Sequence, residues 1–410
     1  MFVMQTRIPH HSDVHPRRGL LTPAIAVALL VVMAATALVL DRLWLESARI
    51  EMTTAAEASA LAAGKQLATE ESLRANDDGL RDLESARQLA AEIAAQNLVA
   101  GQPVSLADPA TGDIRFGQSV WNRDLAVRRF VETEYRPTSV VVTLRRTRAG
   151  DNPVALFVSG LTGQPAGDVT VRVEATIDNR VRGVRPFPGA RVPAVPLAIL
   201  EQDPTGNRSD TWEAAIEQRG GQDQYRCNPE TGQITAEPDG IPELILRTGI
   251  DADSSTAPNA RLVDLGTSFQ SDRLESQIRH GWTAEHLAAF GGELAFDGVP
   301  ILLPARTESS ESICAGFDAL IGQARICLLY TAGESAGTGA AGQISCDRLV
   351  AIRVLDVRWT SHNSCEVIVQ PGVVTTRTAM LTGDGPDFEQ ISSAGRTERN
   401  RYIYKLHLSR

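Results

Sequence analysis

The chain lacks the short motifs that mark the common hydrolases and nucleotide-dependent enzymes. It has no G-x-S-x-G nucleophile elbow, no G-x-x-x-x-G-K-[ST] phosphate loop and no H-E-x-x-H zinc helix. The letters G-x-G-x-x-G do occur at residues 337–342, but a strand pattern follows them instead of a helix, which predicts a flexible hairpin loop. We therefore expect no catalytic, cofactor-binding or metal-binding residues, and a protein that is not an enzyme.

Basic residues are fewer than acidic ones, 40 against 50. Without the three arginines and one aspartate of residues 1–19, the remainder has 37 basic and 49 acidic residues. Nucleic-acid binding needs clustered Lys and Arg, so this balance argues against a nucleic-acid partner.

Cysteines are absent from the first half of the chain, and the five present are Cys227, Cys314, Cys327, Cys346 and Cys365. No C-x-x-C pair occurs, which argues against a zinc site. In an oxidising compartment an odd set of five predicts two disulfides and one free thiol, with fifteen pairings open. A fully reduced set remains the alternative.

Charge is absent from all twenty-one residues between Leu20 and Leu40, and this apolar run predicts a membrane-spanning helix with Leu30 at its middle. At a rise of about 1.5 Å per residue the helix reaches about 32 Å, against a hydrocarbon core of about 30 Å. A cleaved signal peptide has a shorter apolar region that ends at a small-residue site, which residues 34–37 could mimic. A buried core helix would keep a polar stripe, and this run has only two threonines.

The flanks of this run predict its orientation. Residues 1–19 hold three arginines and one acidic residue, and Arg17 and Arg18 lie next to the apolar run. Basic flanks stay on the cytoplasmic side of a membrane. We expect residues 1–19 in the cytoplasm, a single span at 20–40, and residues 41–410 outside. Trp44 then lies at the outer interface, where aromatic side chains are common.

Helical periodicity continues beyond the span. Small and apolar residues recur at spacings of three and four on a face made by Ala56, Ala60, Ala63 and Leu67. The turn residues at 76–79 predict the end of this helix, and a second apolar stripe at 83–93 predicts another. We expect residues 41–103 to form a helical stalk. Its Ala-rich face either packs within the protein or docks against a partner helix.

From residue 104 the pattern changes to short β-rich runs, at 140–144, 153–158 and 169–175. Prolines between 180 and 204 predict a boundary, so 104–205 is read as a β-rich domain. Residues 206–410 read as a mixed domain, with helices predicted at 211–218 and 271–290 and strands at 324–330, 349–357 and 365–374. The predicted class is α+β, in which a membrane helix and stalk precede antiparallel β-rich extracytoplasmic domains.

The N-terminal region resembles that of the TadG-like proteins of Flp/Tad pilus assembly. The resemblance covers about residues 16–65 and rests on Arg17-Arg18-Gly19, the apolar span, Asp41 and the string RIEMTTAAEASALAA at 49–63. It implies a bacterial, single-pass inner-membrane protein that is accessory to a pilus or export apparatus. Related pseudopilins carry Glu five residues after the cleavage glycine, whereas this chain has Ala24 there.

The hypothesis that follows is a non-enzymatic assembly or structural protein. Its partners would be the lipid bilayer and other pilus-assembly or envelope proteins. One alternative is a membrane-tethered receptor or ligand-binding protein, which would show a deep pocket with converging polar groups in 206–410. The sequence identifies no small-molecule ligand for such a pocket. A tethered hydrolase has the least support, because no nucleophile–base arrangement is visible.

Overall fold

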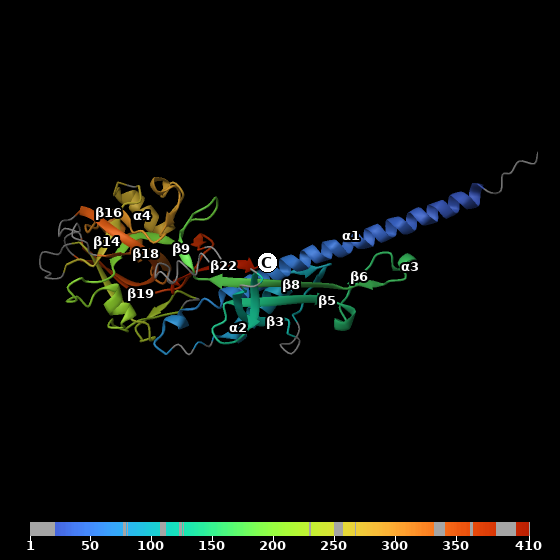
Figure 1. The fold of residues 1–410 in the computed structure, drawn as a ribbon, viewed down its shortest axis with the longest axis horizontal. Helices are drawn as coiled ribbons and strands as arrows, with labels where there is room; N and C mark the ends of the chain where they lie inside the picture. The colour runs from blue at the N-terminus through green and yellow to red at the C-terminus, as the bar shows by residue number, and fades with distance from the viewer. Residues whose placement is uncertain are drawn as a thin grey trace, which may run out of the picture. The chain divides into compact units, whose positions relative to one another are not determined.

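The structure, a computed structural model, describes residues 21–76, 79, 81–106, 112–122, 125, 127–228, 231–249, 257–266, 268–331, 341–360, 364–382 and 399–409. Its helical elements are α1 (Leu21–Lys65), η1 (Glu70–Leu73), α2 (Leu83–Gln96), η3 (Arg148–Gly150), α3 (Ser159–Thr162), η4 (Glu213–Glu217), α4 (Ser271–His280), η5 (Ala288–Phe290) and α5 (Glu311–Asp318). Figure 1 shows these with the strands. The expected α+β class is confirmed.

The strands of the first half are β1 (Leu98–Val99), β2 (Gln102–Pro103), β3 (Ile114–Asn122), β4 (Val127–Glu132), β5 (Ser139–Arg146), β6 (Val154–Ala155), β7 (Ala166–Gly167), β8 (Val169–Asp178), β9 (Val181–Val184) and β10 (Ala194–Leu200). Those of the second half are β11 (Arg226–Cys227), β12 (Ile234–Thr235), β13 (Leu244–Thr248), β14 (Ala260–Val263), β15 (Leu294–Ala295), β16 (Ile301–Arg306), β17 (Ala324–Thr331), β18 (Ala341–Thr360), β19 (Ser364–Pro371), β20 (Val374–Thr375), β21 (Ala379–Leu381) and β22 (Ile403–Ser409).

The chain divides into two compact units that interleave along the sequence. The first comprises Met1–Thr54, Leu98–Gln102 and Leu144–Val171. It contains most of α1, the strand pair β1–β2 and the antiparallel pair β6–β7 with α3 between its strands. Helix α1 is 45 residues long and is continuous. It is long and apolar enough to cross a membrane.

The second unit comprises Ala55–Asn97, Pro103–Thr143 and Arg172–Arg410. One of its sheets has six strands in the order β20-β22-β8-β5-β3-β4. The last turns of α1 pack closely on this sheet. At Gly64 an added Cβ would lie 3.0 Å from Leu406, 3.5 Å from Ala175 and 3.7 Å from Val140, which belong to β22, β8 and β5. Small residues on α1 therefore allow the helix and the sheet to approach closely.

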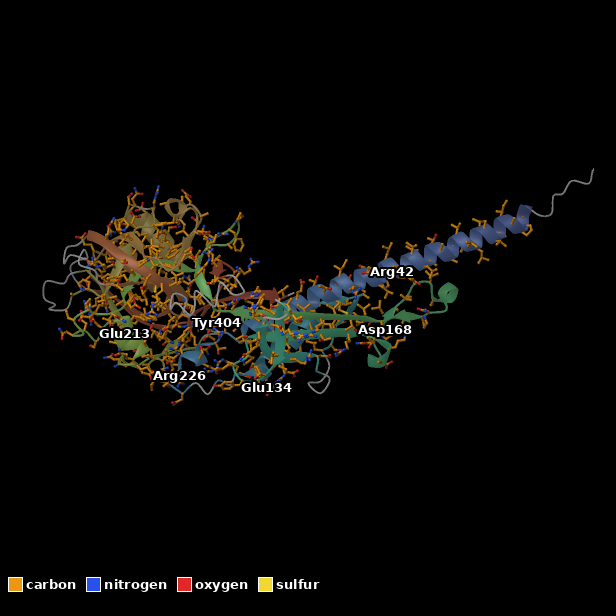
Figure 2. The ribbon with its side chains drawn as sticks, in the orientation of Figure 1. Arg42, Glu134, Asp168, Glu213, Arg226 and Tyr404 are labelled. Atoms are coloured by element: carbon orange, nitrogen blue, oxygen red, sulfur yellow. The ribbon has the colours of Figure 1, made fainter. Side chains whose placement is uncertain are left out.

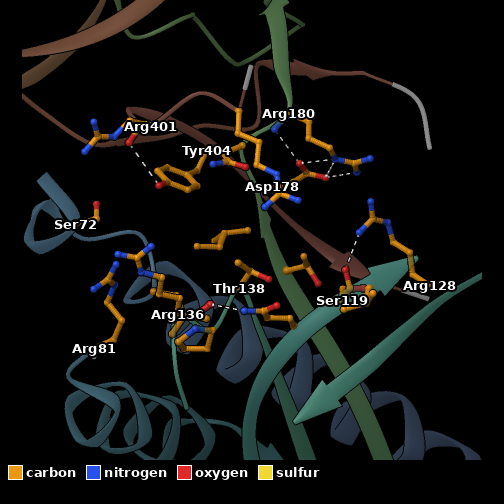
Figure 3. A pocket seen from close by; sticks show the side chains of 18 of the residues that line it. Ser72, Arg81, Ser119, Arg128, Arg136, Thr138, Asp178, Arg180, Arg401 and Tyr404 are labelled. Atoms are coloured by element: carbon orange, nitrogen blue, oxygen red, sulfur yellow. Dashed lines mark hydrogen bonds and ion pairs between the residues drawn. The ribbon is translucent and has the colours of Figure 1, made fainter. Parts of the chain in front are cut away.

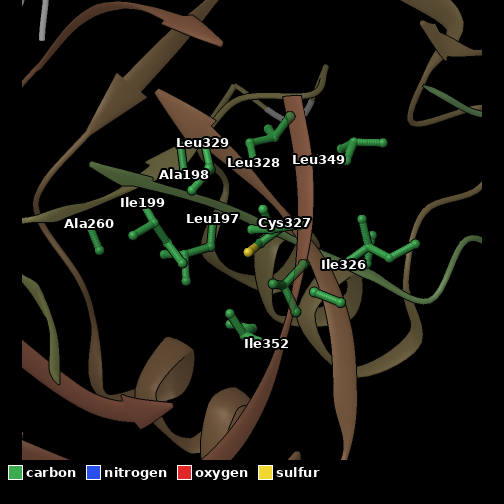
Figure 4. Packing of buried hydrophobic residues seen from close by; sticks show 14 of the residues in the cluster. Leu197, Ala198, Ile199, Ala260, Ile326, Cys327, Leu328, Leu329, Leu349 and Ile352 are labelled. Carbon is green, nitrogen blue, oxygen red and sulfur yellow. The ribbon is translucent and has the colours of Figure 1, made fainter. Parts of the chain in front are cut away.

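The other large sheet of this unit has seven strands in the order β13-β19-β18-β16-β14-β10-β17, and β18 also pairs with β17. That extra pairing closes β18, β16, β14, β10 and β17 into a ring. Every residue of β10 is buried, as expected for a strand covered on both faces. Figure 4 shows the packing of β10 residues such as Leu197 and Ile199 with Ile326, Cys327 and Ile352 in the core.

The observed elements differ from the prediction at several places. The helix expected at 271–290 ends at His280. The β-rich run at 153–158 is a strand only at β6, because the chain turns into α3 at Ser159. Helix α1 ends at Lys65, before the turn at 76–79 that we expected to end it. The domain boundary expected near residue 205 is crossed by the ring, since β10 pairs in parallel with β17. The hairpin loop expected at 337–342 has residues 337–340 outside the described part, although β17 and β18 do pair antiparallel.

Candidate functional site

The predicted membrane anchor is an exposed helical segment. Leu30 is 62% exposed and Leu40 is 51% exposed, and the described residues 22–40 are exposed except Ala34 and Ala37. Such apolar exposure argues against the buried core helix considered from the sequence. Leu20, Arg17 and Arg18, which complete the anchor and its topology signal, lie outside the described residues.

Asp41 is the first charged residue after the apolar run, and its side chain is buried. Its Oδ1 accepts hydrogen bonds from the backbone N–H of Phe157 at 2.9 Å and of Val158 at 3.3 Å. The Oδ2 atom is buried without a hydrogen-bond partner among the described residues. Asp41 thus joins α1 to the segment that precedes α3, within the first unit.

Trp44, one turn further along α1, holds the same segment. Its indole Nε1–H donates to the carbonyl oxygen of Ala155 at 3.0 Å. Its ring packs on Phe157 with the ring centroids 4.8 Å apart. The returning strand β7 passes very close to Leu45, where a Cβ added at Gly167 would lie 2.6 Å from a Leu45 methyl carbon. A larger residue at position 167 would therefore require the Leu45 side chain to shift.

The opposite face of α1 is exposed beyond the apolar run as well. Leu43 is 61% exposed and Ile50 is 68% exposed. They are seven residues apart, so they lie two turns apart on one side of the helix. The exposed apolar surface of α1 consequently continues past Asp41 and Arg42.

The predicted partner-helix face is occupied within the protein. Ala56, Ala60 and Ala63 are fully buried and Leu67 is 4% exposed. The helical spacing was correct, but the face packs on the protein's own sheet, as the contacts around Gly64 show. The interpretation as a face for a partner helix is therefore wrong for this conformation.

The two disulfides expected from the sequence are not formed. Cys227, Cys314, Cys327, Cys346 and Cys365 are all free and buried. Burial raises the pKa of Cys346 to about 12, and it also raises the pKa of Cys327. Cys314 and Cys365 are hydrogen-bonded to each other, and that bond together with burial raises the pKa of Cys365. Among the described residues no group of three His, Cys, Asp or Glu side chains could hold a metal ion.

The second unit contains a cavity of about 800 Å³ rich in arginine (Figure 3). Its titratable lining consists of one aspartate, Asp178, with one tyrosine, Tyr404, and six arginines, which are Arg81, Arg128, Arg136, Arg180, Arg399 and Arg401. A neighbouring cavity of about 740 Å³ has four acidic and four basic residues in its lining. The first cavity is therefore distinguished by its positive charge.

The six-stranded sheet positions much of this lining. Asp178 ends β8, and Arg180 follows it with its Nε 3.0 Å from one carboxylate oxygen and 3.1 Å from the other. Burial raises the pKa of Asp178, but the hydrogen bonds and charge of Arg180 outweigh this and hold that pKa below its ordinary value. On β4, Arg128 donates from Nη1 to the Ser119 carbonyl oxygen at 2.9 Å. Tyr404 comes from β22.

Sequence reasoning missed this cavity. Its arginines come from separate parts of the chain, and no local pattern links Arg81, Arg136 and Arg401. The deep pocket considered as an alternative was expected in 206–410, whereas most of this lining precedes residue 181. Comparisons of this chain with protein-family models, with curated proteins and with solved structures found no match.

Proposed function

We propose that this protein is a non-enzymatic, single-pass membrane protein that acts as an assembly or structural accessory of a Flp/Tad-type pilus or a related export apparatus. Residues 1–19 lie in the bacterial cytoplasm, α1 crosses the inner membrane, and the remainder is extracytoplasmic. The observation that carries the proposal is the exposed apolar surface of α1, which runs through the span and continues to Leu43 and Ile50. Exposed contiguous apolar surface is typical of membrane and protein contacts.

The contact face assigned to a partner moves from the Ala-rich face to the side of α1 that carries Leu43 and Ile50. A simple tether has no need for exposed leucine and isoleucine on the part of the helix beyond its charged boundary. Leu43 and Ile50 extend the lipid-facing surface by two turns, so a partner helix that lies beside α1 in the membrane would continue along the same side.

In-cell photo-crosslinking from position 50 tests this proposal. The matched control is a photo-reactive residue at Lys65, which is also exposed and also on α1. We expect Ile50 to trap a subunit of the pilus or export apparatus and Lys65 to trap none. Deletion of the gene should reduce piliation or surface protein export. Unchanged piliation, adhesion and export would overturn the proposal.

A second candidate function is binding of an anionic ligand by a membrane-tethered receptor. The arginine-rich cavity favours it, because six arginines and one aspartate leave an excess of five positive charges around about 800 Å³. Arginine is well suited to carboxylate and phosphate groups, to which it donates paired hydrogen bonds. The chemistry therefore fits a ligand that carries several carboxylates or phosphates.

Calorimetric titration of the full chain in nanodiscs with inorganic pyrophosphate tests this function. We expect binding that weakens as salt increases, since charge supplies the attraction. Arg136→Glu with Arg401→Glu should abolish it, whereas Arg42→Glu on α1 should not. Absence of binding at low salt, or equal binding by both variants, would exclude the cavity as an anion receptor.

A further inference from the structure

The segment from β6 to β7 forms a loop beside α1 that has a marked pattern of charge. No charged residue occurs between Asp151 and Asp168, a stretch of sixteen residues in a chain in which 22% are charged. Arg148 and Asp168 stand at its base, with the Arg148 backbone N–H donating to the Asp168 carboxylate at 3.0 Å. The loop thus has a charged base and an uncharged tip.

The contacts with α1 show which way this tip points. Ala155 meets Trp44, and the next contact, at Phe157 and Val158, is with Asp41. Three residues of helix correspond to about 4.5 Å, so the chain moves toward the apolar end of α1 as it approaches α3. It returns at Gly167, which lies against Leu45. The residues between these two passages, including α3, therefore extend toward the span.

The burial of α1 agrees with this direction. Ala37, one turn nearer the N-terminus than Asp41, is the single buried residue among described residues 22–40. Within the first unit, α3 is the element that follows the two amides bound by Asp41, on the side of Asp41 toward which the chain runs. The loop consequently reaches the level of the apolar run, past the charged boundary marked by Asp41 and Arg42. Figure 2 labels Arg42 and Asp168, the charged residues that mark this boundary on the helix and on the loop.

The tip carries an exposed aromatic side chain. Phe157 is 70% exposed even though its ring packs on Trp44. Its backbone N–H is bound by Asp41, so the main chain at Phe157 is held by a contact that does not depend on its own side chain.

We propose that the tip of the β6–β7 loop is a second membrane contact, which inserts Phe157 and α3 into the headgroup and acyl boundary of the outer leaflet. The inference rests on the proposed membrane placement of α1. The occupant is phospholipid because the tip is continuous with the lipid-facing surface of α1 at the depth where that surface begins. Amphipathic elements with aromatic residues commonly lie at this boundary, about 5–10 Å deep.

The two contacts together would fix the folded part on the membrane. A single helix leaves the protein free to rotate about the helix axis and to tilt. A second point of insertion beside the helix removes that freedom, and it orients the exposed side of α1 that carries Leu43 and Ile50.

Spin labels on the full chain in nanodiscs test the inference. Gly160→Cys places a label on α3 without disturbing Phe157, since an added Cβ there meets nothing within 4 Å. Leu30→Cys reports the span, and Gln102→Cys reports an exposed position of the same unit far from the apolar run. The native thiols are buried, so the unsubstituted chain serves as the labelling control. Collision with oxygen reports lipid, and collision with a water-soluble nickel chelate reports water.

We expect the Gly160 label to collide with oxygen more often, and with nickel at least fivefold less often, than the Gln102 label. Its depth should fall between those of Gln102 and Leu30. A Leu30 label in lipid with a Gly160 label in water would overturn the loop contact and leave the anchor intact. A Leu30 label in water would overturn both. A Gly160 label shielded from both reagents would mean that protein covers the tip, which also overturns the inference.

Discussion

Replacing Asp41 by alanine removes a side chain that binds the backbone N–H groups of both Phe157 and Val158. The carboxylate accepts from their backbone N–H groups at 2.9 and 3.3 Å, and Asp41 is 4% exposed. Hydrogen bonds to charged groups contribute about 1.5–3 kcal/mol each, and a buried N–H left without a partner costs about 1–3 kcal/mol. The 3.3 Å bond from Val158 contributes at the low end of the first range. The cost of burying Oδ2 without a partner among the described residues offsets part of the stabilisation from the two hydrogen bonds. We expect a loss of about 2–3 kcal/mol of local stability.

Hydrogen exchange measured by mass spectrometry on the full chain in nanodiscs reports this loss directly. Local opening controls exchange of the Phe157 and Val158 amides. Each 1.4 kcal/mol corresponds to a tenfold change, so Asp41→Ala should speed exchange in peptides covering 155–160 by about 30- to 140-fold. Peptides from the core strand β10 should be unchanged.

Two control variants separate the hydrogen bonds from charge alone. Asp41→Asn keeps a carbonyl oxygen as acceptor and should show a smaller acceleration than alanine. Arg42→Ala changes an adjacent residue whose side chain is 80% exposed, and it should leave exchange at 155–160 as in the parent chain. If Asp41→Ala also leaves these amides as protected as before, the junction described between α1 and the loop is incorrect.

Four further changes have definite expected results. Leu30→Arg should cost about 2.5–3.5 kcal/mol of insertion free energy, seen as release from the membrane pellet on alkaline carbonate washing, and full retention would contradict the anchor. Ala60→Leu, at a fully buried position, should destabilise the protein by about 1–3 kcal/mol through overpacking, measured as a lower melting temperature than that of the half-buried control Ala62→Leu. Asp178→Asn removes the carboxylate charge that faces the buried Arg180 guanidinium and should cost about 3 kcal/mol at neutral pH. Because the folded pKa of Asp178 lies below 3.8, its stabilisation is present above pH 3.8 and is lost as pH falls through the folded pKa, so the variant should lack that part of the acid-induced decline in melting temperature. A membrane-impermeant maleimide should label none of the five cysteines in the native chain and all five in urea. If the chain in urea takes only three labels and the unlabelled chain is 2 Da lighter than the fully reduced chain, Cys314 and Cys365 have been oxidised to a disulfide.

Local sequence patterns predicted which segments form helices and strands better than they predicted which segments pack against one another. The runs at 140–144, 169–175, 324–330 and 349–357 are confirmed within β5, β8, β17 and β18, because alternation and β-branched residues are local signals. The helical spacing of Ala56, Ala60 and Ala63 predicted one face correctly. What covers that face could not be predicted, since β5, β8 and β22 reach it from distant parts of the sequence.

The same limit explains the two sites found only in the structure. The arginine cavity depends on tertiary folding that brings Arg81 and Arg401, far apart in the sequence, to one place. The run at 153–158 has the composition of a strand, but Asp41 and Trp44 hold it as a short strand followed by a turn. Tertiary hydrogen bonds override local strand preference there.

The pairing of β22 with β8 has a consequence for how an exported chain of this kind would mature. Ser409 hydrogen-bonds to Thr176 across 233 residues of sequence. If the polypeptide emerges from the translocon in order from its anchored end, β8 can pair with β5 at once, but its other edge stays unpaired until β22 (residues 403–409) has been threaded through. Loss of residues 401–410 would then strip β22 from the interior of the six-stranded sheet, so a truncation just before residue 401 should be as damaging as one much earlier.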